Sequence, residues 1–199
     1  MLNDDQVSLL EKLDEQGILS DVFISYNTNA SIYPSDRLID LWQRSRLVKL
    51  FLSIDAVEQA FEYIRWPAVW SAVEKNILRM KKELPSNVMF GFNITVGSYN
   101  IFEIKAVKQW IDQNLSCNRE GDSSDFNWQI ADNFDPKWLH KDIKQLAIMQ
   151  LDGVVDSITA YLESYIEHSS SDHWIEMLDR IDFKRGTRWK KQLLIGNYY

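Results

Sequence analysis

The stretch Val88-Met-Phe-Gly-Phe-Asn-Ile-Thr-Val96 decides the fold of this chain. It is rich in β-branched and aromatic residues and follows the breaker Leu84-Pro85-Ser86, so it predicts a buried strand. Leu47-Val-Lys-Leu-Phe-Leu-Ser-Ile54 has the same character. Between the two lies a long helical stretch in which Val73 and Ile77 share one side. A strand, a helical crossover and a second strand predict a βαβ unit with parallel strands.

The same alternation continues on both sides of this unit. Further strands are predicted at Asp21–Tyr26 and Phe126–Ala131, and further helices at Val7–Leu13, Pro34–Trp42, Ile101–Leu115, Lys137–Ile166 and Asp172–Ile181. Asn118–Asp125 is polar and charged, which predicts a mobile loop. Such crossovers fit either a doubly wound sheet or part of a (β/α) barrel. Because four strands cannot close a barrel, the chain is either an open sheet or a piece of something larger.

Composition limits the classes of function. The 199 residues, 45% hydrophobic and 26% charged, predict one globular domain. A net charge of −7 argues against a general nucleic-acid binder, which needs an excess of Lys and Arg. No apolar run reaches the roughly 20 residues that cross a bilayer, and the acidic N-terminus is no signal peptide, so we expect no membrane association and a cytoplasmic location. Cys117 is the single cysteine, which excludes an internal disulfide and a multi-cysteine metal site within one chain.

Polar side chains recur at one parity near the ends of the first three predicted strands. They are Ser25 and Asn27 in the first, Ser53 and Asp55 in the second, and Asn93 and Thr95 in the third. The opposite parity is apolar, as at Leu52 and Ile94. Parallel α/β sheets bind ligands at the carboxyl ends of their strands, so this edge is a candidate ligand site. The alternative is that polarity simply returns where each strand enters a loop.

Several segments, in this order and spacing, resemble radical S-adenosylmethionine (SAM) proteins of the twitch-domain and SPASM-related groups. The segments are Ser25-Tyr-Asn-Thr-Asn29, Leu52-Ser-Ile-Asp-Ala56, Phe61-Glu-Tyr-Ile-Arg-Trp-Pro67, Asn93-Ile-Thr-Val-Gly-Ser-Tyr-Asn100 and Asp179-Arg-Ile-Asp-Phe-Lys-Arg-Gly-Thr187. The resemblance implies a parallel α/β sheet that corresponds to the later strands of a partial radical SAM barrel. It implies that barrel over residues 1–135, and C-terminal helices over residues 136–199 that pack on it as a single globular unit. Met1-Leu2 matches a pair that follows the second barrel strand in similar sequences, which implies that the chain begins just past that strand.

The resemblance also implies roles for matched positions. Ser53 matches a residue that contacts the ribose or carboxylate of SAM, and Arg65 resembles the arginine that pairs with the SAM carboxylate. Asn27 and Asn29 are implied to lie at the barrel mouth beside the adenosyl group. The matched third-strand segment holds Asn93, and Thr95 two residues later is implied to lie near the adenine. For Arg65 a solvated helix arginine is the alternative, and Asp55 is alternatively a helix cap.

The family's iron–sulfur loop is missing from this chain. Family members hold a [4Fe–4S] cluster through three cysteines, whereas Cys117 stands alone here and lies downstream of the sheet. Ala56 also stands where the family usually has glycine. SAM and the [4Fe–4S] cluster are therefore implied for the parent protein, and neither is expected to bind stably to this chain alone.

Three functional hypotheses remain at this point. The chain is a fragment of a radical SAM enzyme with an unknown substrate, or a non-catalytic binding or structural subunit derived from that fold, or an unrelated α/β enzyme with its site at the same strand ends. Under the first two, the first strand exposes an edge that either a missing N-terminal half or a second copy covers, so we expect self-association of the isolated chain.

Overall fold

The computed structural model describes residues 4–115 and 125–199, and contacts between residues divide the chain into two compact units. Unit 1 comprises Met1–Ser53, Ser71–Asn93 and Leu115–Asn127, and unit 2 comprises Ile54–Trp70, Ile94–Asn114 and Trp128–Tyr199. The predicted loop from Asn118 lies, up to Ser124, outside the described residues.

The described strands form one sheet in the order β1-β2-β3-β4, with all strands parallel. Their bounds are β1 Phe23–Thr28, β2 Leu47–Ser53, β3 Val88–Val96 and β4 Asp125–Ile130. Phe23 lies opposite Leu47, and Ser53 lies opposite Asn93. The prediction of a parallel α/β fold is confirmed, and β3 has the predicted bounds.

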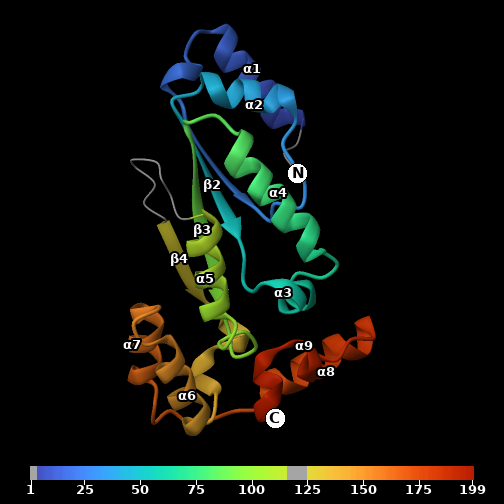
Figure 1. Ribbon diagram of the computed structural model, residues 1–199, viewed down its shortest axis with the longest axis vertical. Coiled ribbons are helices and arrows are strands. Elements are labelled where there is room, and N and C mark those ends of the chain that lie inside the picture. The colour runs from blue at the N-terminus through green and yellow to red at the C-terminus, as the bar shows by residue number, and fades with distance from the viewer. Residues whose placement is uncertain (1–3, 116–124) are drawn as a thin grey trace. The chain divides into compact units, whose positions relative to one another are not determined.

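Unit 1 builds its core on one face of β1, β2 and β3 (Figure 1). Its helices are α1 Asp4–Glu15, α2 Asp36–Arg44 and most of α4 Trp70–Glu83. α2 begins at Ser35, whose hydroxyl oxygen accepts from the N–H of Leu38 at 3.4 Å. Side chains on the apolar parity of the strands are buried, as at Ile24 and Leu52, so the predicted alternation is confirmed. α1 and α2 are in contact, and Arg44 reaches Asp14 between them at 3.2 Å.

Unit 2 is mainly helical. Its helices are α3 Glu58–Ile64, most of α5 Ile104–Leu115, α6 Lys141–Leu151, α7 Asp156–Ser164, α8 His173–Arg185 and α9 Trp189–Gln192. The prediction of one helix over Lys137–Ile166 is wrong. α6 ends before Asp152 and α7 begins after Val155, because Gly153 adopts the left-handed φ of 67° that interrupts a helix.

The interior of unit 2 is rich in tryptophan. The ring of Trp70 meets Phe61 edge-on at 5.0 Å and Trp110 at 5.1 Å between centroids. Trp174 and Trp189 are almost completely buried and meet at 5.8 Å. Trp70, Trp174 and Trp189 are therefore core residues of unit 2, whereas Trp66 is 55% exposed. Within the part of the chain that the structure describes, no helix combines the length and apolar character needed to cross a membrane.

Candidate functional site

In unit 1, asparagine side chains are linked across the polar face of the sheet. The Nδ2 group of Asn93 donates to Oδ1 of Asn27 at 2.7 Å, and Nδ2 of Asn127 donates to Oδ1 of Asn93 at 3.1 Å. Ser53 is opposite Asn93 in the strand register and is half-buried. The structure therefore brings together three sequence-predicted residues, Asn27, Ser53 and Asn93, and adds Asn127. The alternation of polar and apolar residues along the strands predicted the first three. The pattern is weaker in the fourth strand and did not single out Asn127.

Asn29 has a different local role. Its Oδ1 accepts from the backbone N–H of Ser31 at 3.1 Å and from the Ser31 hydroxyl at 2.8 Å, which closes the turn after β1. The next residue, Ala30, is buried with a left-handed φ of 54°. No hydrogen bond of Asn29 to the other asparagines occurs among the described residues, so its side chain shapes a loop.

In unit 2, a buried carboxylate holds Arg65. Oδ2 of Asp55 lies 2.6 Å from Nη2 of Arg65, and Oδ1 accepts from the N–H of Thr95 at 2.7 Å. The side chain of Asp55 is 5% exposed and that of Arg65 is 30% exposed. Burial raises the pKa of Asp55 above its ordinary value, and the nearby Arg65 guanidinium opposes that rise. Asp55 therefore acts as a support for Arg65 and for β3, and it makes no helix cap.

The turn after β3 fixes this support. Nδ2 of Asn100 donates to the carbonyl oxygens of Asp55 and Thr95 at 2.8 and 2.9 Å, and its Oδ1 accepts from Gly97 N–H at 2.7 Å. A Cβ on Gly97 would lie 2.5 Å from the ring of Tyr99, so glycine is required there. Burial raises the pKa of Tyr99, and the Asp55 carboxylate adds to that rise. Sequence reasoning placed Asn100 inside a resembling segment but gave it no role.

The structure shows how alanine is accommodated at position 56, where the resembling family usually has glycine. Ala56 is fully buried, and the left-handed backbone falls on Glu58, with φ 52°. The alanine is therefore not strained, because the positive φ that favours glycine lies two residues later.

The C-terminal segment supports the end of α3, next to Arg65. Nη1 of Arg185 donates to the carbonyl oxygen of Tyr63 at 3.0 Å, and its guanidinium lies 5.3 Å from the centre of the Trp66 ring. Asp182 in turn accepts from the hydroxyl of Thr187 at 2.6 Å and from Trp189 N–H at 2.7 Å. Gly186, with φ 69°, ends α8 between them. The sequence predicted no structure for this C-terminal segment. In the structure it forms a brace that supports the end of α3.

The described residues contain no group of three or more His, Cys, Asp and Glu side chains that could hold a metal ion. His168 and His173 instead lie beside the Trp138 ring, at 4.9 and 5.7 Å between centroids. Cys117 lies outside the described residues.

Compared with protein-family models, curated proteins and solved structures, the chain matches none of them. The functional argument therefore rests on the residues and their geometry.

Proposed function

We propose that this chain is the later part of a radical SAM barrel and that Arg65 binds the carboxylate of SAM. The arrangement of Arg65 is the observation that carries the proposal. One side of its guanidinium is fixed 2.6 Å from buried Asp55, while 30% of the side chain remains exposed. Its Nε is buried and has no hydrogen-bond partner among the described residues, so the exposed part of the guanidinium is the part that can meet a ligand. A guanidinium held in this way presents a planar fork of donors that suits a carboxylate.

Within unit 1, amide and hydroxyl groups are suited by themselves to a neutral polar ligand group. Asn27, Asn93 and Ser53 carry no charge and lie on an exposed or half-buried face of the sheet. Such groups accept and donate hydrogen bonds to ribose hydroxyls or to the edge of a base. The resemblance assigns Ser53 to the ribose or carboxylate, Asn27 and Asn29 to the adenosyl group, and Thr95 to the adenine.

The [4Fe–4S] cluster does not fit the residues of this chain. Its ligation takes three thiolates from one loop, and Cys117 is the single cysteine. A cluster would therefore have to be held by thiolates that these 199 residues do not supply. The contribution proposed for this chain is to bind the carboxylate of SAM through Arg65.

A titration followed by NMR tests the binding role. We expect millimolar SAM, or its product analogue S-adenosylhomocysteine, to shift the Nε–H signal of Arg65 and the amide signal of Thr95. The variant R65K keeps a cation beside Asp55 but lacks the fork, so it should lose most of the binding. R79A, at an exposed arginine on α4 that pairs with Glu83, is the matched control and should bind as wild type does. Binding that is equal in wild type and R65K would exclude the proposed carboxylate contact.

A non-catalytic subunit is the second candidate function. The single cysteine favours it, because no cluster can form on this chain alone. The intact mass of the protein from its source separates the two candidates. A chain about twice this length with a three-cysteine loop supports the enzyme, whereas a native mass of 23.4 kDa supports the subunit.

A further inference from the structure

Among the residues that the structure describes, strand β1 pairs with β2 alone, so its other side forms an open edge of the sheet. The carbonyl oxygen of Val22, just before β1, accepts from the N–H of Arg46 at 3.1 Å, just before β2. Backbone groups alternate sides along a strand, so the N–H and C=O groups of Phe23, Ser25 and Asn27 point away from β2. Unpaired groups in such a row are a template for another strand.

The residues of β1 carry none of the usual protection of an edge. Phe23–Thr28 contains no charged side chain, no proline and no glycine. Phe23 is 55% exposed although it is aromatic. This edge is therefore chemically open to pairing.

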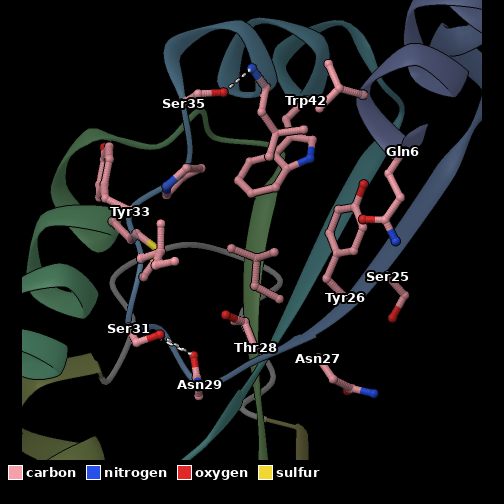
Figure 2. A pocket seen from close by; sticks show the side chains of 16 residues that line it. Gln6, Ser25, Tyr26, Asn27, Thr28, Asn29, Ser31, Tyr33, Ser35 and Trp42 are labelled. Atoms are coloured by element: carbon pink, nitrogen blue, oxygen red, sulfur yellow. Dashed lines mark hydrogen bonds between the residues drawn. The ribbon is translucent and has the colours of Figure 1, made fainter. Parts of the chain in front are cut away.

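A hollow of about 800 Å³ runs beside the same edge, within unit 1 (Figure 2). Its walls come from β1, the loop after β1, α1, α2 and α4, and Leu50 of β2 also lines it. Four consecutive residues, Ser25–Thr28, line it. Because successive side chains point to opposite faces of a sheet, a hollow lined by all four follows the edge of the strand rather than one face.

The residues that line the hollow favour an uncharged occupant. None of the lining residues is charged, and the rings of Tyr26 and Trp42 stand with Leu38 and Met80 around the space. Trp42 is 2% exposed, and its ring lies 5.8 Å from the ring of Tyr26 between centroids, so the two aromatic side chains form an apolar wall.

We infer that the free edge of β1 and the adjoining hollow form a docking site for one uncharged β-strand of another polypeptide. The backbone of that strand pairs with Phe23, Ser25 and Asn27. Its alternate side chains, which are apolar, fill the hollow beside Trp42. Backbone pairing supplies affinity and the pocket supplies specificity, as in other cases of strand addition. The inference stands on β1 and the hollow alone and does not depend on the proposed function.

The open edge led us to expect self-association from the sequence, but the hollow makes a second copy of this chain a poorer occupant than another strand. In an antiparallel β1–β1 pair related by a two-fold axis perpendicular to the sheet, the helices of both copies lie on the same side. Tyr26 and Thr28 of each copy would then lie on the side of the helices. In each copy these two side chains already form a wall of that copy's own hollow, so they cannot fill the hollow of the other copy. The two hollows would be joined and neither would be filled.

Fusion of a strand to the full chain tests the inference. A Thr-Val-Thr-Val-Thr-Val segment is joined to the N-terminus through a Gly/Ser linker of about 15 residues, which spans roughly 20 Å. We expect amide hydrogen exchange to slow at least about tenfold at Phe23, Ser25 and Asn27, because intramolecular pairing works at millimolar effective concentration. Ile24 and Tyr26 already face β2, so their exchange should hardly change. This contrast within one molecule separates docking from a general change in stability.

A matched fusion serves as the control. A Thr-Glu-Thr-Glu-Thr-Glu segment on the same linker places charges over the hollow and should give no protection. Equal protection by both segments, or none by the Thr-Val segment, would overturn the inference. Protection of the unfused chain that rises between about 10 μM and about 1 mM would also overturn it, because a second copy would then be the occupant.

Discussion

Replacement of Asn100 should destabilise unit 2 more than its small size suggests. The side chain is fully buried and makes three hydrogen bonds, all of them to backbone groups. In Asn100→Ala the N–H of Gly97 and the carbonyl oxygens of Asp55 and Thr95 lose these partners. Each net hydrogen bond is worth about 1 kcal/mol, and each orphaned buried group adds part of a cost of about 1–3 kcal/mol. The expected loss in free energy of unfolding is therefore about 3–5 kcal/mol.

Thermal and urea unfolding measure this loss. For a chain of this length each kcal/mol lowers Tm by about 2–4 °C, so Asn100→Ala should melt about 10 °C lower. The fluorescence of the buried tryptophans of unit 2 reports on the transition. S157A, at an exposed position of α7 in unit 2, serves as the control and should melt as wild type does.

The variant N100D separates hydrogen bonding from packing. It keeps the shape and the acceptor for Gly97, but it turns an oxygen toward the two carbonyl oxygens in place of Nδ2. An ionised carboxylate there would be repelled, so we expect its pKa to be raised in the folded state. N100D should then be destabilised at pH 7 and should recover in part as the pH falls and the group protonates. Wild-type stability of N100D at pH 7 would refute this reasoning.

Three further predictions concern unit 2. Burial raises the pKa of Glu103 to about 7. The protonated carboxyl therefore contributes its full stabilisation of the folded state below the unfolded pKa of about 4.3, and this stabilisation is lost as the pH rises through about 7. E103Q keeps an acceptor for Leu194 N–H and should exceed the wild type in free energy of unfolding at pH 8, by at most about 4 kcal/mol, and equal it at pH 4, which a Tm series against pH checks. K144M should lose about 2 kcal/mol in urea unfolding, because buried Lys144 donates to two carbonyl oxygens after α7, and an unchanged midpoint would contradict this. R185A should lose about 1 kcal/mol and loosen the Trp66 ring, visible as a fluorescence change, whereas a neutral result would mean that the brace is dispensable.

Local chemistry made much of the sheet predictable. Val88–Val96 is rich in β-branched and aromatic residues with a breaker before it, so both its type and its bounds follow from the sequence. Alternation also predicted which side chains share a face, and Asn27 and Asn93 are joined by a hydrogen bond there. The break at Gly153 was missed because helical periodicity on both sides masked one left-handed residue.

The candidate site was harder to predict, since its supports come from distant parts of the chain. Arg65 was singled out by resemblance, but Asp55 as its partner emerges only where the end of β2 meets the end of α3. The brace from Arg185 to Tyr63 joins residues far apart in the sequence, and no local pattern signals such a contact.

By itself, then, the sequence determined the alternation of strands and helices, the polar parity of the strand ends and the absence of a three-cysteine loop. These follow from side-chain periodicity and residue type, which act within a few residues of the chain. The tertiary structure alone decided that Asp55 holds Arg65, that Asn100 joins three backbone groups and that a hollow follows the free edge of β1. Those features depend on hydrogen bonds and packing between segments whose proximity only the folded chain creates.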